Sequence, residues 1–269
     1  MPTPAVQPDL KQWADRLYAK EPDAGKCGRS GFGGLSMKLS RRSFCACALG
    51  APLMARPAFA QGAACEVMTP ERQARTMPDE AISRLAEGNR RFVEGRTVNC
   101  DLAAQARRTA TYQAPFAAIV GCIDSRVPPE LIFDQRIGDV FCARVAGNFV
   151  NTDILGSLEY ATAVAGAKAV VVLGHTSCGA IESAIKGVEM GHITGLLANI
   201  APAVATAQAG AADHPAGADR AAGVTVANVG LTVEAVTARS AVMRALVAAG
   251  KLKVAGAVHD VATGRVAWL

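Results

Sequence analysis

Three side chains able to bind a soft metal ion occur in two short segments of the sequence. Cys122 lies in Gly-Cys-Ile-Asp-Ser-Arg, residues 121–126, and His175 and Cys178 lie in Gly-His-Thr-Ser-Cys-Gly, residues 174–179. Two thiolates and one imidazole form a donor set that selects zinc over hard cations. Three protein ligands leave a fourth position open, which is typical of catalytic zinc sites. The pattern therefore predicts a catalytic zinc centre.

Two charged residues close to the first cysteine could take part in the chemistry. Asp124 and Arg126 follow Cys122 within the same segment. Zinc lowers the pKa of a bound water toward ~7 and so supplies a hydroxide nucleophile at neutral pH. Asp124 can accept a hydrogen bond from that nucleophile and orient it. Arg126 can hold the carboxylate through a bidentate pair and keep it ionised.

Buried strands must bring these segments together. Short, nearly continuous apolar runs suit strands buried on both faces of a sheet, and they occur at residues 116–121, 140–145 and 169–174. A helical pattern at 153–165, begun by a capping residue, gives the spacing of a strand-helix-strand crossover. Cys122 and His175 directly follow the first and third runs, and sites in open α/β sheets form at the carboxyl ends of strands. We therefore expect an α/β fold with a mostly parallel central sheet flanked by helices.

Helical and strand patterns continue through the rest of the chain. Helices are predicted at residues 78–94 and 231–249, and strands joined by a Thr263-Gly264 turn at residues 252–258 and 265–268. Cys178 stands at an expected helix start, where the helix dipole lowers the pKa of a thiol. The Ala- and Gly-rich stretch 201–223 is predicted to form helix ends and a surface loop. Without an internal repeat, residues 61–269 are expected to form a single domain.

The net charge of +5 belongs entirely to the N-terminal part of the chain. Residues 1–60 hold nine Lys and Arg against four Asp and Glu, whereas the remaining residues hold 19 of each. A neutral balance argues against a nucleic-acid partner. No apolar run reaches the roughly 18 to 20 residues that a spanning helix needs, so an integral membrane protein is not expected.

Residues 1–60 have the features of an export leader. A basic start after Met37 precedes an apolar stretch and Ala-Phe-Ala at 58–60, a small-x-small cleavage pattern. The paired Arg41 and Arg42 resemble the twin-arginine signal of proteins that are exported folded. We therefore expect recognition by the export machinery, cleavage near Ala60 and a periplasmic location. Whether the residues before Met37 are translated stays open.

Five of the eight cysteines belong to the expected mature chain. A disulfide framework is typical of small domains without a core, so cysteine chemistry is the first expectation for a chain of this length. Cys65, Cys100 and Cys142 remain outside the zinc set, and none forms a Cys-x-x-Cys redox pair. Cys65 and Cys100 are candidates for a disulfide, although the sequence does not reveal their separation.

The two ligand segments closely resemble those of the β-class carbonic anhydrases. The similarity continues through Glu-Gly-Asn-Arg-Arg-Phe at 87–92, Ala-Gly-Asn at 146–148, Ser-Leu-Glu-Tyr at 157–160 and Gly-Ala-Val-His-Asp at 256–260. The resemblance implies zinc held by Cys122, His175 and Cys178. It also implies Asp124 and Arg126 as the catalytic dyad, and a lyase, built as a homodimer or higher even oligomer, that reversibly hydrates carbon dioxide to bicarbonate and a proton.

The same resemblance implies a substrate pocket across the dimer interface, formed by Gln113, Phe141, Tyr160 and Gly179. Some members carry a proton-accepting histidine four residues after the tyrosine, where this chain has Val164, so the proton route stays open.

The resemblance also bears on the resting state of the zinc site. In some members the aspartate leaves its arginine and closes the zinc site, and those under bicarbonate control carry a tryptophan where this chain has Ile119. Ile119 cannot donate a hydrogen bond. We therefore expect Asp124 to stay paired with Arg126, and to become a fourth ligand only in a closed resting state.

Two other functions fit the same residues. One is hydrolysis of carbon disulfide or carbonyl sulfide on the same zinc scaffold, which would depend on a channel width that the sequence does not show. The other is a zinc-binding module without turnover. That module would be expected to lack Asp124 or Arg126, and both are present.

Overall fold

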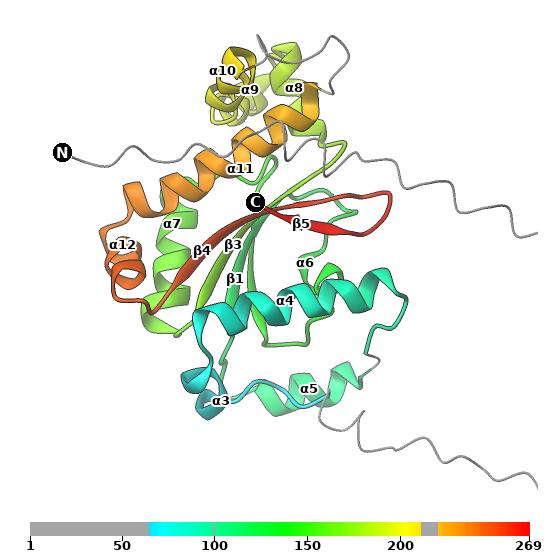
Figure 1. The fold of residues 1–269 in the computed structure, drawn as a ribbon, viewed down its shortest axis with the longest axis vertical. Helices are drawn as coiled ribbons and strands as arrows, with labels where there is room; N and C mark the ends of the chain where they lie inside the picture. The colour runs from blue at the N-terminus through cyan, green and yellow to red at the C-terminus, as the bar shows by residue number, and fades with distance from the viewer. Residues whose placement is uncertain (1–64, 99, 211–219) are drawn as a thin grey trace, which may run out of the picture.

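The computed structural model describes residues 65–98, 100–210 and 220–269. The expected leader, residues 1–60, lies outside the described residues. A five-stranded sheet forms the centre of the described part, with helices on both of its faces (Figure 1). The predicted α/β fold with a mostly parallel sheet is confirmed.

The strands follow the order β2-β1-β3-β4-β5 across the sheet. Their bounds are β1 (Ala117–Gly121), β2 (Val140–Arg144), β3 (Ala169–His175), β4 (Lys253–His259) and β5 (Val266–Trp268). The first four pair in parallel, and β5 pairs antiparallel with β4. β1 and β3 are buried along their whole length, which explains their nearly continuous apolar sequences. All five strands lie where the sequence predicted them.

Helices cover both faces of the sheet. Their bounds are α3 (Pro70–Arg75), α4 (Pro78–Val93), α5 (Leu102–Thr109), α6 (Pro129–Ile132), α7 (Thr152–Glu159), the π-helical turn η1 (Tyr160–Val164), α8 (Gly179–Lys186), α9 (Gly191–Leu197), α10 (Ala201–Gly210), α11 (Arg220–Arg239) and α12 (Ala241–Ala248). On the α4 and α6 face, Leu85 clusters with Ile119 of β1. On the α7, α11 and α12 face, Leu158 and Met243 cluster with Val120. Neighbouring residues of β1 thus serve opposite cores, as strand geometry requires.

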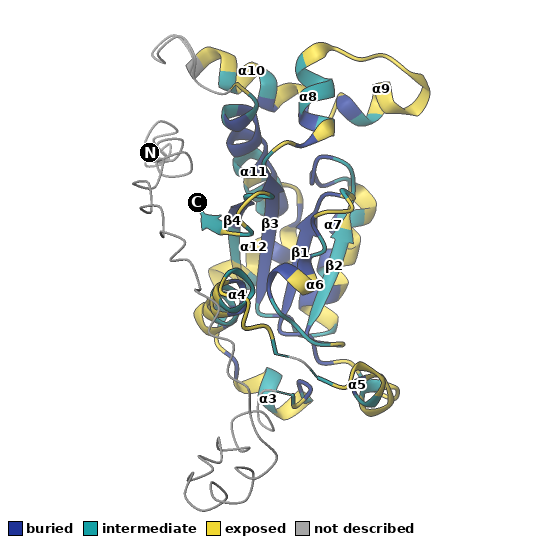
Figure 2. Cartoon of the chain, turned by 90° about the vertical axis from the view of Figure 1, so that its right-hand side faces the viewer, coloured by how far each residue is buried: buried dark blue, intermediate teal, exposed yellow. Residues whose placement is uncertain are grey.

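A third group of helices lies beyond the carboxyl ends of the strands. α8, α9 and α10 project there together with one end of α11 (Figure 2). Ile181 of α8, Val224 of α11 and Ile200, in the turn between α9 and α10, are buried in one cluster with Cys122 and Cys178. This cluster packs apolar side chains against the sulfur-bearing loops.

Close approach of two helices depends on Gly88 in α4. A Cβ atom at this position would lie 1.8 Å from the carbonyl oxygen of Phe133, the residue that follows α6. Only glycine allows α4 to lie this close to the chain that leads from α6 to β2. The position belongs to the Glu-Gly-Asn-Arg-Arg-Phe motif at 87–92.

Two helical predictions need correction. The stretch 201–223 contains the ten-residue helix α10, because alanine has the highest helix propensity and outweighs the scattered glycines. The helix predicted over 231–249 is two helices, because the Ser240 hydroxyl accepts the backbone N–H of Met243 and starts α12 anew. The crossover helix predicted at 153–165 is confirmed: it begins at Thr152, is capped by Asn151 and ends in the π-helical turn η1.

By length and composition, α11 could cross a membrane, although no such segment was expected. Half of its apolar window is buried in the structure, where Val229 and Val236 pack on the sheet. α11 contacts both β3 and β4. In this fold it is a core helix.

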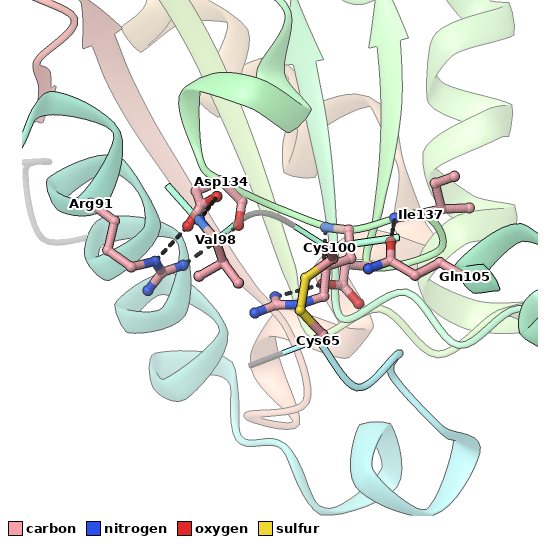
Figure 3. Close-up of a disulfide and its surroundings, with 9 residues drawn as sticks. Cys65, Arg91, Val98, Cys100, Gln105, Asp134 and Ile137 are labelled. Atoms are coloured by element: carbon pink, nitrogen blue, oxygen red, sulfur yellow. Dashed lines mark hydrogen bonds and ion pairs between the residues drawn. A yellow bond between two sulfur atoms is a disulfide. The ribbon is translucent and has the colours of Figure 1, made fainter. Parts of the chain in front are cut away.

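A disulfide fastens the segment before α3 to the segment before α5. Cys65 and Cys100 are bonded, with their Cα atoms 5.6 Å apart (Figure 3). The candidate pair from the sequence is therefore confirmed. Cysteines of this chain thus form a disulfide as well as a candidate metal site. Nearby, the Arg91–Asp134 ion pair joins α4 to the loop after α6, and the backbone N–H of Val98 donates to Asp134 at 3.1 Å.

Candidate metal centre

Cys122, His175 and Cys178 come together at the carboxyl end of the sheet. Cys122 directly follows β1, His175 is the last residue of β3, and Cys178 directly precedes α8. Because β1 and β3 are adjacent and parallel, the segments that follow them meet. The three potential ligand atoms lie within 4.8 Å of one another, and all three side chains are buried. The fold thus assembles the predicted donor set.

The hydrogen bonds of His175 define its tautomer. Its Nδ1 lies 2.9 Å from the carbonyl oxygen of Thr176. A carbonyl oxygen only accepts, so Nδ1 carries the proton and Nε2 keeps a free lone pair. Nε2 is buried and has no hydrogen-bond partner among the described residues. An unpaired buried nitrogen within reach of two thiols fits a metal ion.

The two thiols control each other's ionisation, with their sulfur atoms 4.0 Å apart. The pKa of Cys122 is lowered, first because the Cys178 thiol donates to it, and the backbone N–H of Gly147 adds to this effect. The pKa of Cys178 is raised by the same contact and by burial. The sequence predicted a lowered pKa at this helix start; backbone N–H groups of α8 do act in that direction, but the contact with Cys122 and burial have the larger effect. A cation between the sulfur atoms would stabilise both thiolates.

Asp124 and Arg126 form an ion pair beside this cluster. Arg126 Nε and Nη2 donate to the two carboxylate oxygens at 3.0 and 2.7 Å, and its backbone N–H donates at 2.9 Å. The Arg126 side chain is the main cause that holds the pKa of Asp124 well below its usual range, although partial burial opposes it. Arg126 Nη2 also donates to the carbonyl oxygen of Ser177 at 3.0 Å. The ionised carboxylate is thereby tied to the loop between His175 and Cys178.

Comparison with known proteins assigns this arrangement to a family. The carbonic anhydrase profile matches residues 117–266, which include the donor set and the ion pair. Carbonic anhydrase 2 of Mycobacterium tuberculosis is 37% identical over 196 residues, covering 71% of this chain and 92% of the relative. The chain belongs to the carbonic anhydrase family.

Solved structures assign this carbonic anhydrase to the β class. Tetrameric β-carbonic anhydrases of Sordaria macrospora match with a TM-score of 0.56 and 28% identity, over 62% of this chain and 90% of that one. A Coccomyxa β-carbonic anhydrase in complex with acetazolamide matches with a TM-score of 0.55 and 29% identity, over 70% of this chain and 86% of that one. The enzyme is a zinc lyase that reversibly hydrates carbon dioxide to bicarbonate.

Residues that sequence reasoning missed hold the first ligand loop of this carbonic anhydrase in place. Arg144, at the end of β2, donates to the carbonyl oxygens of Cys122 at 2.8 Å and of Asp124 at 2.6 Å. The backbone N–H of Gly147 lies 3.4 Å from Cys122 Sγ. Gly147 has φ +83°, and a Cβ atom there would lie 2.4 Å from Ile200, so only glycine fits. The Ala-Gly-Asn motif at 146–148 was the available signal.

Three of the four expected pocket residues lie together on the β2 side of the molecule. Gln113 Nε2 donates to Tyr160 Oη at 3.4 Å, and the rings of Phe141 and Tyr160 meet edge-on at 6.4 Å. The two aromatic residues line an open cavity of about 600 Å³ between β2 and α7. Gly179 does not line this cavity; it is the first residue of α8, directly after Cys178.

His259 lies beside the candidate metal centre. It ends β4 and pairs in register with His175 at the end of β3. Burial lowers the pKa of His259, and the proximity of His175 adds to this effect. Its carbonyl oxygen accepts the backbone N–H of Thr176 at 2.9 Å. The end of β4 therefore forms one wall of the second ligand loop.

Proposed function

We propose that Cys122, His175 and Cys178 hold the zinc ion of this carbonic anhydrase. The observation that carries this proposal is the buried His175 Nε2, which lacks a hydrogen-bond partner in the described part of the chain and lies within 4.8 Å of two cysteine sulfur atoms. One nitrogen and two sulfur donors form a set that suits zinc. When bound, zinc acts as a Lewis acid that makes a hydroxide nucleophile available at neutral pH.

The role of the Asp124–Arg126 pair follows from its hydrogen bonds. An ionised carboxylate has no proton to donate, so Asp124 must accept a hydrogen bond from the nucleophile. This hydrogen bond directs the lone pair of the nucleophile toward carbon dioxide. Arg126 keeps the carboxylate charged and fixed through its two side-chain hydrogen bonds. Its bond to Ser177 holds the pair at a set distance from the ligand loop.

Two variants test these roles. Cys178→Ser should lose both zinc, measured by metal analysis, and carbon dioxide hydration, measured by stopped flow, because it removes a ligand. Arg126→Ala should keep the zinc and lose most turnover, because the three ligand side chains stay intact. Cys142→Ser serves as the control for zinc content, since Cys142 is a free cysteine outside the cluster. Unchanged zinc in Cys178→Ser, or near-normal turnover in Arg126→Ala, would refute the respective role.

The resting site is proposed to be open, with Asp124 held by Arg126. Three hydrogen bonds between these residues support this state. Ile119 is fully buried in β1 and offers no side-chain donor to a bicarbonate ion. An experimental structure of the zinc-loaded enzyme near pH 8 should keep the pair. An Asp124 oxygen within ~2.2 Å of zinc, or sigmoidal inhibition by bicarbonate, would contradict it.

The enzyme is also proposed to form a homodimer or a higher even oligomer. Tyr160 and Val164 of η1 are large side chains that are 49% and 72% exposed, and the Tyr160 ring meets Phe141 of the edge strand β2. The Sordaria macrospora relatives are described as tetrameric. Val164→Glu should then shift the protein to a smaller species in light scattering and reduce activity while zinc is retained. An unchanged mass would exclude this surface as the interface.

Export to the periplasm is the last proposal, with residues 1–60 as the leader and 61–269 as the mature domain. The paired arginines and the Ala-Phe-Ala pattern at 58–60 support it. The Cys65–Cys100 disulfide adds support, because disulfides are rare in the reducing cytoplasm. Arg41→Lys combined with Arg42→Lys should leave the precursor in the cytoplasm upon cell fractionation. A mature N-terminus far from Gln61 in mass spectrometry would overturn the cleavage site.

A further inference from the structure

We propose that Thr176 and Asp260 are positioning residues that keep His175 in its metal-binding tautomer. Neither residue touches the reacting atoms, and both act through the carbonyl oxygen of Thr176. The inference rests on the proposed role of His175 as a zinc ligand. It assigns a function to the turn between β4 and β5, which lies far from both ligand loops in the sequence.

Thr176 is held from its backbone and from its side chain. Its backbone N–H donates to the carbonyl oxygen of His259 at 2.9 Å, which extends the pairing of β3 with β4 by one residue. Its hydroxyl donates to Asp260 Oδ1 at 3.3 Å and accepts the backbone N–H of Val261 at 3.1 Å. Thr176, the residue directly after His175, is therefore fixed to the end of β4.

Asp260 is a firm anchor because the turn itself holds its carboxylate. Oδ1 accepts the backbone N–H of Ala262 at 2.9 Å, and Oδ2 accepts the hydroxyl of Thr263 at 2.8 Å. The pKa of Asp260 is lowered by these hydrogen bonds and by Thr176, which together outweigh the effect of partial burial. The backbone of Asp260 also pairs with Arg265 and Gly264 across the turn, at 2.8 Å each. The carboxylate cannot follow Thr176 if the ligand loop moves.

The peptide that links Thr176 to Ser177 is the element that needs this anchor. Ser177 has φ +54°, a left-handed backbone conformation that residues other than glycine, asparagine and aspartate rarely adopt. Rotation of this peptide would relieve the conformation. It would also turn the Thr176 carbonyl away from His175 Nδ1 and present the Ser177 N–H instead.

Such a rotation would reverse the proton distribution on the imidazole. An N–H facing Nδ1 favours the tautomer that carries its proton on Nε2, the atom that must bind the metal. The hydroxyl of Thr176 ties this residue to the end of β4 through its two bonds to residues 260 and 261, and so holds the Thr176 carbonyl within reach of Nδ1. Removing it should therefore weaken zinc binding although all three ligands remain.

The test is Thr176→Val, which keeps the shape of the side chain and removes the hydroxyl. Zinc affinity is measured by competition with a chromophoric chelator, and the visible spectrum of the cobalt-substituted protein reports the geometry of the ligands. We expect zinc affinity to fall about 10- to 100-fold, with a changed cobalt spectrum. Thr176→Ser should restore both, because it keeps the hydroxyl.

Thr162→Val is the matched control, since Thr162 is a buried threonine of η1 whose hydroxyl bonds to Leu158 and Met243 and to no residue of the metal centre. It should leave zinc affinity and the cobalt spectrum as in the wild type. If Thr176→Val does not fold, Asp260→Ala decides the question by the same two measurements, because it removes the anchor and keeps residue 176.

Two results would overturn the inference. One is a zinc affinity and cobalt spectrum of Thr176→Val equal to those of Thr162→Val. The other is a Thr176→Ser protein as impaired as Thr176→Val. A wrong assignment of the zinc ligands would give a different result. The Cys178→Ser variant would then retain zinc, or the wild-type protein would contain none.

Discussion

Removing the Cys65–Cys100 disulfide should lower the free energy of unfolding by about 4 kcal/mol. The bridge joins residues separated by 35 positions and encloses α3 and α4. In the chain-entropy treatment, a 15-residue loop contributes about 3 kcal/mol and a 100-residue loop about 4.7 kcal/mol, so this loop lies between them. At about 2 to 4 °C per kcal/mol for a domain of this size, Tm should fall by roughly 8 to 16 °C.

The effect should act mainly through the unfolded chain. Val67 and Met68, next to Cys65, are buried in the folded protein, and Gln73 of α3 donates to the carbonyl oxygens of Pro115 and Ala165 at 2.7 Å each. These contacts do not need the disulfide, so the folded structure should survive its loss. An unfolded chain without the bridge is less compact, so the dependence of unfolding on urea should also become steeper.

The variant Cys65→Ser with Cys100→Ser is compared with the wild type by urea and thermal unfolding, at equal protein concentration and full zinc loading. Cys142→Ser is the matched control, because it makes the same atomic change at a free cysteine. Wild-type protein treated with a reductant should behave like the double variant. A loss in the double variant no larger than that in Cys142→Ser would refute the reasoning.

Three further outcomes follow from single positions. Gly88→Ala should cost about 3 kcal/mol or more in urea unfolding, because its Cβ would meet the carbonyl oxygen of Phe133, whereas Gly230→Ala, with nothing within 4 Å, should not. Ser177→Val should destabilise the fold by about 1 to 3 kcal/mol relative to Ser177→Gly in thermal unfolding, because φ is +54°. The Asp124–Arg126 pair should stabilise the fold above the usual aspartate pKa and lose this effect as pH falls through the lowered pKa of Asp124. In Arg126→Ala, NMR titration should find that pKa raised toward ~3.9; an unchanged value would contradict the assigned cause.

The sequence by itself determined the chemistry and the main elements of the enzyme. Cys122, His175 and Cys178 were identifiable because their side-chain types are scarce, soft metal ligands and because Cys122 and His175 directly follow apolar runs. The strands were identifiable because burial on both faces leaves few choices besides Ala, Val, Ile and Leu. These signals are local: each depends on residues that are neighbours along the chain.

Helix boundaries were harder to predict where local preferences compete. In 201–223, alanine favours a helix while glycine and proline oppose it, and packing against α11 and α8 adds support that no local pattern contains. The break at Ser240 depends on its hydroxyl capping α12 rather than facing solvent. Neither outcome follows from periodicity alone.

Only the tertiary structure decided how the metal centre is held. The contacts of Arg144 with the Cys122 loop and the anchoring of Thr176 by Asp260 each join residues far apart in the sequence. The tautomer of His175 likewise depends on the direction of one carbonyl oxygen. Such contacts are set by strand order and register, which bring the ends of β1, β3 and β4 to one edge. The sequence specifies which side chains can do the chemistry, whereas their orientation is a property of the packed sheet.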